Sequence, residues 1–165
     1  MRYFYCPRCG GKLTQRLLGD EGDVPYCANC HRPWFDAFST CILAAVVRDR
    51  QVALLRQGEA HWGLVSGYVK PGERAEDAAL REIQEELGLT ARNPVLVGTY
   101  PFAQRDLLMV GLIAETDGAG FRLSSEVEAA QWVPVRQALG MVYPPPSSAF
   151  SVLQACMERL ERQRP

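Results

Sequence analysis

Three glutamates close together in the sequence are the residues best suited to chemistry. Glu82, Glu85 and Glu86 belong to the segment from Arg74 to Leu87, which has strong helix formers and no internal proline or glycine and so predicts a helix. At about 100° per residue, their carboxylates fall within an arc about 100° wide. This density of carboxylate oxygens suits a hard cation such as Mg²⁺ or Mn²⁺, which also takes phosphate oxygens and waters as ligands. The competing interpretation is an ordinary solvated helix face.

The residues around the glutamates predict how they are presented. Leu80, Ile83 and Leu87 form a neighbouring apolar stripe, so one side of the helix should pack on a sheet while its solvated acidic flank faces a cleft. Gly67 precedes a bend where the backbone must approach another group closely. Gly88 stands where the end of a helix needs positive φ. These glycines favour a built site over a merely solvated face.

Four of the six cysteines have the spacing of a zinc site. Cys6 and Cys9 form one CxxC pair, Cys27 and Cys30 form another, and 17 residues separate the pairs. Disulfides are disfavoured in a reducing compartment, and a redox motif of the thioredoxin type would need one CxxC at a strand-to-helix junction. We therefore expect structural zinc, because four thiolates leave no open position for a reacting water.

Three other residues of metal-binding type have simpler interpretations. His31 directly follows a ligand cysteine, but four thiolates already complete a tetrahedron, so we expect a surface side chain. Cys41 and Cys156 lie in an apparent strand and an apparent helix and are expected to be small buried hydrophobes.

The elements that must position these residues follow from the apolar pattern. Residues 1–36 predict a zinc ribbon too small to fold without metal, and residues 37–165 predict a second, catalytic domain. In the second domain the central helix is flanked by predicted strands at 40–47, 51–55, 94–100, 107–115 and 129–133, and by a closing helix at 147–163. This order is that of an α+β protein.

Composition excludes several classes of function. With 165 residues and 47% hydrophobic content, the chain can bury one good core and little more. A net charge of −1 argues against a general polyanion binder, so a nucleic-acid partner would need a local basic patch. The amino terminus lacks the apolar region of a signal peptide, and the run at 41–47 is too short to span a bilayer. We expect a cytoplasmic protein without a membrane partner.

The segment 67–89 resembles the Nudix box, GX5EX7REUXEEXGU, in which U is aliphatic. Every fixed place is matched, by Gly67, Glu73, Arg81, Glu82, Glu85, Glu86 and Gly88, with Ile83 and Leu89 at the aliphatic places. Seven required identities at average usage give a chance match of about 10⁻⁸ per register. The resemblance implies an α/β/α sandwich with a mixed sheet, and a metal-dependent hydrolase that cleaves the phosphoanhydride of a nucleoside diphosphate linked to another group.

The resemblance also implies roles for individual residues. Glu82, Glu85 and Glu86 would hold Mg²⁺ or Mn²⁺, and Arg81 with Glu73 would form an ion pair that orients these ligands. One of Glu86, Glu85 or Glu126 would take the proton of the attacking water, and the sequence does not choose among them.

A further metal ligand is implied after the box. Glu126 lies six residues before Trp132, the place that resembles a family region, E-x₅-W-[FV], whose glutamate completes the metal site. Glu128 is the alternative ligand, and a solvated loop acid is the competing interpretation for Glu126.

A zinc ribbon placed before a Nudix domain is similar to the NADH pyrophosphatase group, which is commonly dimeric. That group carries SQPWPFPxS after the box, where this chain has VGTYPFAQR at 97–105, so the motif is matched only in part. Tyr100 and Phe102 would then contact substrate together with Gly67, with stacking on a base at one aromatic or both. The alternative is that these alternate residues of a strand cover the core.

Three functions are consistent with these features. The first is hydrolysis of NAD(H), ADP-ribose or FAD that releases AMP. The second is removal of a nucleotide cap from RNA with the ribbon touching the strand, although residues 1–36 hold five Lys/Arg against four Asp/Glu. The third is a sensor that binds nucleotide without cleaving it, which would have no need for a complete carboxylate set.

Overall fold

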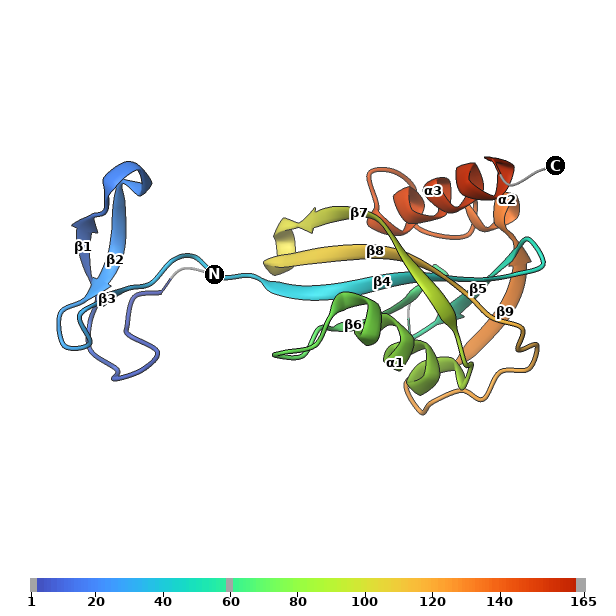
Figure 1. Cartoon of the computed structure of the whole chain (residues 1–165), viewed down its shortest axis with the longest axis horizontal. Helices are drawn as coiled ribbons and strands as arrows, with labels where there is room; N and C mark the ends of the chain where they lie inside the picture. Colours follow the sequence, from blue (N-terminus) through green and yellow to red (C-terminus); the bar gives the residue numbers. More distant parts are fainter. Residues whose placement is uncertain (1–2, 59–60, 163–165) are drawn as a thin grey trace. The chain divides into compact units, whose positions relative to one another are not determined.

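The computed structural model describes residues 3–58 and 61–162, and the chain forms two compact units, residues 1–39 and 40–165 (Figure 1). The sequence predicted a boundary after residue 36. Each unit is described by itself, because their relative placement is not determined.

The first unit is a small antiparallel sheet. Its elements are β1 (Thr14–Leu17), the 3₁₀ turn η1 (Gly19–Glu21), β2 (Asp23–Cys27) and β3 (Arg32–Pro33), and β2 is the central strand. Among its described residues only Cys6, Val24 and Cys27 are buried apolar side chains. A core of this size cannot offset the entropy of ordering the chain, so the unit needs a crosslink such as a metal.

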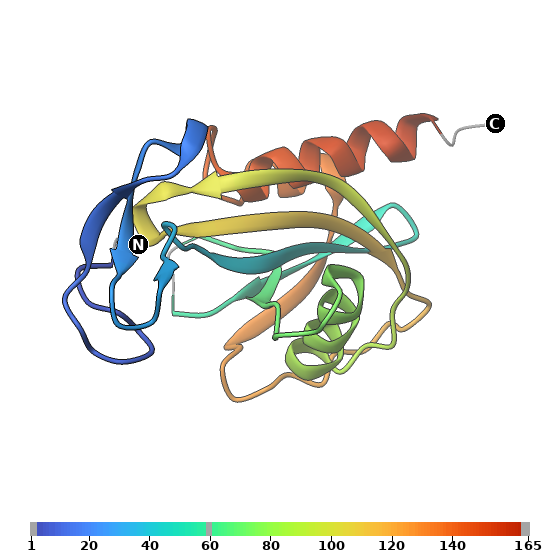
Figure 2. The same ribbon diagram turned by 60° about the vertical axis from the view of Figure 1, so that its left-hand side comes forward.

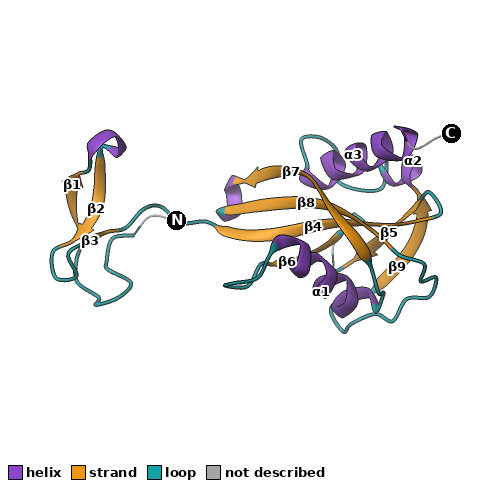
Figure 3. Cartoon of the chain, viewed as in Figure 1, coloured by secondary structure: helices purple, strands orange, loops and turns teal. Residues whose placement is uncertain are grey.

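The second unit is built on one six-stranded sheet. Its strands are β4 (Ser39–Arg48), β5 (Gln51–Arg56), β6 (Val65–Tyr68), β7 (Arg92–Phe102), β8 (Leu107–Glu115) and β9 (Ala129–Pro134). The order across the sheet is β7-β8-β4-β5-β9, and β6 pairs with β4 at Cys41–Ala44. Figures 1 and 2 show the elements, and Figure 3 separates helices from strands by colour.

Helices cover both faces of this sheet (Figure 3). The helix α1 (Ala75–Leu87) packs on one face, and α3 (Ser148–Arg162), with the short α2 (Val135–Ala138), packs on the other. In β4 the side chains alternate between the two cores, since Leu43 and Ala45 lie in the cluster with α3 and Ala44 in the cluster with α1. Burial on both faces explains the continuous apolar run that predicted this strand.

The helix α1 follows the prediction with one important difference. It begins after Arg74, and Gly88 ends it at φ 67° with its N–H donating to the Gln84 carbonyl, as the glycine predicted. Ile83 and Leu87 are buried, but Leu80 is only partly buried. The expectation that the acidic flank is solvated is wrong at Glu86, which is only 5% exposed.

The other elements lie close to their predicted ranges. Residues 107–115 form β8 as predicted, and β7 is longer than the predicted 94–100. The closing helix starts at Ser148, where the Ser147 hydroxyl accepts a hydrogen bond from the Phe150 N–H at 3.2 Å, and residue 163 lies outside the described residues. No helix in the described ranges is long and apolar enough to cross a membrane.

Candidate metal sites and nucleotide cleft

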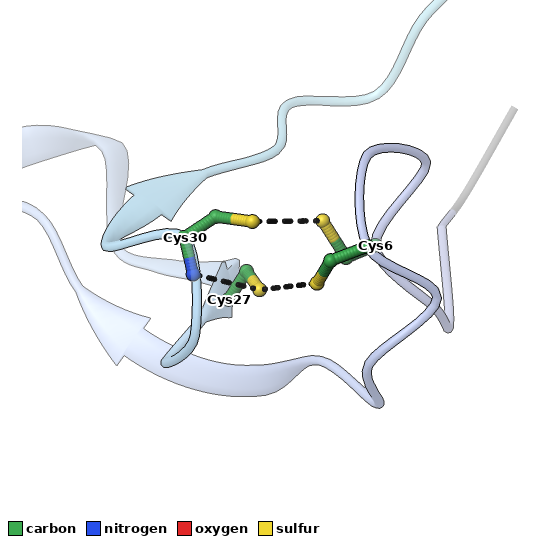
Figure 4. Close-up of side chains that lie close together, drawn as sticks. Cys6, Cys27 and Cys30 are labelled. Atoms are coloured by element: carbon green, nitrogen blue, oxygen red, sulfur yellow. Dashed lines mark hydrogen bonds between the residues drawn. The ribbon is translucent and has the colours of Figure 1, made fainter.

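The four predicted zinc ligands come together in the first unit, and Figure 4 labels three of them, Cys6, Cys27 and Cys30. The sulfurs of Cys6, Cys9, Cys27 and Cys30 all lie within 4.8 Å of one another. The Cys6 and Cys30 sulfurs are 3.8 Å apart, and those of Cys9 and Cys27 are 3.6 Å apart. A tetrahedron with metal–sulfur distances of about 2.3 Å has edges of about 3.8 Å, so the thiols fit one tetrahedral ion.

Backbone turns hold these thiols in place. The Cys6 N–H donates to the Gly11 carbonyl at 2.8 Å, and the Gly10 N–H donates to the Cys6 carbonyl at 2.9 Å. Burial alone would raise the pKa of the Cys6 thiol, but backbone amides of Cys9 and Arg8 lower that pKa to about 6. The pKa of Cys30 is raised in turn to about 12 by the sulfur of Cys9, by burial and by the sulfur of Cys27, so the crowded thiols do not all ionise together without a cation. His31 is exposed and lies outside the cluster, as predicted.

In the second unit, Arg81 and Glu73 form the predicted ion pair. The Arg81 guanidinium donates from Nε to Glu73 Oε1 at 2.7 Å and from Nη2 to Glu73 Oε2 at 3.0 Å. Glu73 also accepts the Lys70 N–H at 2.9 Å, so it fixes the turn before α1. Hydrogen bonding to Arg81, joined by the Lys70 amide, lowers the pKa of Glu73 to about 2. Glu73 is therefore a carboxylate at all ordinary pH values.

Arg81 also contacts two predicted metal ligands. Its Nη1 lies 2.6 Å from Glu82 Oε1 and 3.0 Å from Glu85 Oε2, while Nη2 donates to the Tyr68 carbonyl at 3.1 Å. One guanidinium thus orients three carboxylates and ties α1 to the end of β6. The side chain of Glu82 is 14% exposed and that of Glu85 is 55% exposed, so these two meet solvent very differently.

Gly67 has a clear structural role in β6. A Cβ at this position would lie 2.1 Å from Glu82 Cδ, so only glycine leaves room for the Glu82 carboxylate. The sequence predicted that some group lies very close to the Gly67 backbone. In the structure this group is the carboxylate of Glu82, a candidate metal ligand.

Glu86 is the most unusual side chain of the site. Gln57 Nε2 donates to its Oε1 at 2.8 Å, but its buried Oε2 has no hydrogen-bond partner among the described residues. Burial, with the neighbouring charges of Glu82 and Glu126, raises the pKa of Glu86 to about 7, although the Gln57 amide and the nearby Ser66 backbone N–H act in the opposite direction. The Ser66 N–H lies outside normal hydrogen-bond geometry to Oε2. A buried carboxylate oxygen without a donor is costly unless a cation or a proton occupies the site. This unpartnered atom fits a hard divalent ion.

These side chains open into a cleft of about 720 Å³. It is lined by Cys41, Gln57, Ser66, Gly67, Tyr68, Lys70, Arg81, Glu82, Glu85, Glu86, Phe102, Arg105, Leu107, Met109 and Glu126. The cleft therefore has acidic side chains from α1 together with an apolar part, in which Tyr68 and Phe102 stay 60% and 38% exposed.

Of the remaining residues that were predicted to contact substrate or metal, some line the cleft and others do not. Phe102 and Glu126 line the cleft, whereas Tyr100 does not. The Tyr100 ring lies against Gly98 and Gly111 and packs on the core beside α3, so for Tyr100 the structure favours the core-packing alternative. Glu128 Oε2 lies 3.3 Å from Arg56 Nε, also away from the cleft lining.

Several cleft residues were missed by the sequence reasoning. Gln57, Tyr68, Lys70 and Arg105 carry no local pattern that marks them, because each comes from a strand end or turn that only the folded sheet brings to α1. Arg105 had one available signal, since it stands where the SQPWPFPxS motif ends in serine.

Comparisons with known proteins agree with this geometry. The NUDIX domain model matches residues 39–153. The chain is 27% identical over 160 residues to the NAD-capped RNA hydrolase NudC of Vibrio parahaemolyticus, covering 94% of this chain and 58% of that protein. It is 30% identical over 162 residues to the protein of the same name from Haemophilus influenzae PittGG, covering 93% and 60%. The chain thus spans about three fifths of the length of these relatives.

Solved structures share the fold. A NUDIX hydrolase from Nitrosomonas europaea superposes with a TM-score of 0.78 at 19% identity, covering 100% of this chain and 95% of that one. The NUDIX domain of Shewanella oneidensis NrtR, solved with ADP ribose, gives a TM-score of 0.64 at 19% identity and covers 82% and 94%. With a family match over more than half of its length, an intact box and this fold, the chain belongs to the Nudix family.

Proposed function

We propose that this protein is a metal-dependent hydrolase of the phosphoanhydride bond in nucleoside diphosphates linked to another group, and that it acts on NAD(H), ADP-ribose or FAD. The observation that carries this proposal is the buried, unpartnered Oε2 of Glu86 beside Glu82 and Glu126 in the cleft. Such an arrangement is destabilising in a protein that binds nothing there.

The residues that would hold Mg²⁺ or Mn²⁺ are Glu82, Glu85, Glu86 and Glu126. When bound, the divalent ions would neutralise the diphosphate, lower the pKa of a water molecule and stabilise the leaving phosphate. Arg81 positions Glu82 and Glu85 through its Nη1, and Glu73 in turn positions Arg81. Lys70, exposed in the turn before α1, would contact the diphosphate directly.

Of the three candidate bases, the geometry favours Glu86. Glu85 accepts a hydrogen bond from the Arg81 guanidinium, whereas Glu86 has no cationic partner among the described residues. Gln57 occupies Oε1, so the buried Oε2 is the oxygen that is left to accept a proton or to hold an ion.

The apolar part of the cleft supports a nucleotide substrate. Phe102 and Tyr68 are exposed aromatic side chains at its border, and a base stacked on an aromatic ring gains about 1–3 kcal/mol. We propose that AMP is one product. Because the SQPWPFPxS motif is matched only in part, we expect NADH to be hydrolysed without a large preference over ADP-ribose or FAD.

Removal of an NAD cap from RNA is the second candidate, favoured by the names of the NudC relatives. It uses the same bond cleavage at the same carboxylates. A non-catalytic sensor is less well supported, because every carboxylate of the box is present and four acidic side chains line one cleft.

Three further properties belong to this proposal. We propose that the four thiolates bind zinc and that the protein is cytoplasmic, because its six cysteines form no disulfide. We also propose that two copies form a homodimer, as the resembled group commonly does. Metal analysis, cell fractionation and sedimentation test these points separately.

The activity is tested by measuring AMP release from NADH, NAD, ADP-ribose, FAD and diadenosine polyphosphates with Mg²⁺ or Mn²⁺. Release of nicotinamide mononucleotide from an RNA that carries an NAD cap is measured in parallel. A kcat/KM for the free nucleotides that equals or exceeds the kcat/KM for the capped RNA would support the first function. Cleavage of the capped RNA at a much higher kcat/KM would support the second. Tight binding of these nucleotides without any cleavage would contradict both and support the sensor.

A further inference from the structure

Three cations line the nucleotide cleft, and they differ in their partners. Arg81 is fully engaged by Glu73, Glu82, Glu85 and the Tyr68 carbonyl. Lys70 and Arg105 form no ion pair with any carboxylate in residues 3–58 and 61–162. Lys70 lies beside Glu73, in the turn before α1. Arg105 comes from another element, the 3₁₀ turn η2 (Ala103–Arg105) that follows β7.

Arg105 is oriented by an aromatic ring. Its guanidinium carbon lies 5.9 Å from the centre of the Phe102 ring, within the range of a cation–π contact. After Arg105 the chain reverses at Asp106, whose φ of 50° is left-handed, and β8 begins. A guanidinium that is positioned on a ring, and whose donors are not used by a carboxylate, can present them as a planar fork, the geometry that binds phosphate through two hydrogen bonds.

We propose that Arg105 is a specificity-determining residue that binds a phosphate group on the ribose of the nucleotide, outside the diphosphate that is hydrolysed. This inference rests on the proposed function, in which Phe102 stacks on the base. Because Arg105 contacts Phe102 and not the carboxylates of α1, the anion that it meets belongs to the nucleoside end of the substrate. The nearest phosphate to a base, apart from the 5′ one, is a group on the ribose 2′ or 3′ oxygen.

Two kinds of substrate carry such a phosphate. One is a dinucleotide with a 2′-phosphate, and the other is an RNA strand, whose first nucleotide carries a 3′-phosphodiester. Their shared chemistry is a phosphate beside the adenosine, and the position of that phosphate distinguishes them.

The test is equilibrium binding by calorimetry in one buffer with Mg²⁺. The probes are 5′-AMP, adenosine 2′,5′-bisphosphate, adenosine 3′,5′-bisphosphate and the dinucleotide pApA. The variants are Arg105→Ala, Arg105→Lys and Arg162→Ala, which removes the same charge from an exposed site on α3 outside the cleft lining. We expect at least one ribose-phosphate probe to bind the wild-type protein about 3- to 30-fold more tightly than 5′-AMP.

In Arg105→Ala the ribose-phosphate probe and 5′-AMP should bind with about equal affinity. The preference should be reduced in Arg105→Lys and stay unchanged in Arg162→Ala. A preference for the 2′ probe would identify phosphorylated dinucleotides, and one for the 3′ probes would identify RNA. Equal affinities of all four probes for the wild-type protein, or a preference that survives Arg105→Ala, would overturn the inference.

The failure of this inference differs from the failure of the proposed function. If the protein hydrolyses ADP-ribose while the probes bind equally, Arg105 has no such role and the proposed function stands. If neither ADP-ribose nor the dinucleotides are hydrolysed but the ribose-phosphate preference is present and depends on Arg105, the anion site exists in a nucleotide-binding protein that is not a hydrolase.

Discussion

At the scale of single residues, Glu86 combines two properties that oppose stability and favour chemistry. It is a carboxylate on a predictable acidic face, yet it is buried and one of its oxygens has no donor. Periodicity placed Glu86 beside Glu82 and Glu85, but it could not show burial. The burial depends on residues far away in the sequence, such as Gln57 after β5, whose Nε2 donates to Glu86 Oε1 at 2.8 Å.

Without added Mg²⁺ or Mn²⁺, Glu86 should make the second unit less stable as pH rises. Its folded pKa of about 7 exceeds the ordinary value of 4.5, so the folded state holds the proton longer than the unfolded state. The stability that this proton contributes is fully present below pH 4.5 and is lost as pH rises through 7. We expect Glu86→Gln to be more stable than wild type at pH 8, by up to about 3 kcal/mol, and no more stable than wild type at pH 4.5. The free energy of unfolding of both proteins is measured by urea titration at each pH. A difference between variant and wild type that is the same at pH 4.5 and pH 8 would contradict the assignment.

In the presence of metal, the same substitution should remove activity. Glu86→Gln keeps an acceptor for Gln57 but loses the charge and the proton acceptor, and Glu85→Gln loses one carboxylate of the Arg81 cluster. We expect each to lower kcat by at least about 10²–10³, with the fold intact. Initial rates at saturating Mg²⁺ measure this, beside circular dichroism as a check of folding. If both variants keep wild-type turnover, the catalytic interpretation of this helix face is wrong.

Gly67 offers a test of how the ligands are positioned. In Gly67→Ala the new Cβ would collide with Glu82, which must move away from the cleft. We expect the affinity for Mn²⁺ to fall about 10- to 100-fold, as when groups that orient metal ligands are removed. Gly120→Ala is the control, because a Cβ there meets nothing within 4 Å and no positive φ is required. Equal Mn²⁺ affinities of the two variants, measured by titration calorimetry, would show that Glu82 does not bind the ion.

At the scale of elements, local pattern predicted the helix and the long strands, and tertiary pairing decided the rest. The helix over 74–87 and the strand over 107–115 have long, strongly periodic sequences. The strand β6 was missed, because VSGY is short, contains glycine and exists as a strand only by pairing with β4. The cleft side chains that β6 and its neighbouring turn supply, Tyr68 and Lys70, were missed with it.

The end of β7 carries a prediction about the base. Phe102 lies at the last position of this strand and lines the cleft, whereas Tyr100, two residues earlier, packs on the core. Phe102→Ala should therefore raise KM for adenine dinucleotides by about 5- to 150-fold with little effect on kcat. Tyr100→Ala should instead lower the free energy of unfolding by about 1–3 kcal/mol, because Tyr100 is partly buried against the core, and change KM less. The reverse pattern in steady-state kinetics and urea unfolding would place the base at Tyr100.

At the scale of the whole molecule, the chain joins two units that hold themselves together by different means. The second unit has two apolar clusters on the faces of one sheet, whereas between residues 3 and 39 Val24 is the one buried apolar side chain besides two cysteines. The CxxC spacing predicted the cysteine cluster from sequence, because each pair is a local motif and the two pairs supply all four ligands of the ion. The placement of one unit against the other has no such signal.

Loss of zinc should consequently damage one unit and spare the other. We expect about one zinc per chain after dialysis against a weak chelator, and its loss together with the solubility of the protein in Cys27→Ser. Cys156→Ser is the matched control, since Cys156 is buried in the core of the second unit and lies outside the sulfur cluster. That variant should keep its zinc and lose stability of the second unit instead. Hydrogen exchange in the soluble fraction of Cys27→Ser should show residues 14–33 exchanging freely while β4 and β8 stay protected, because their core contains no zinc ligand. Full zinc content in Cys27→Ser would contradict the four-thiolate site.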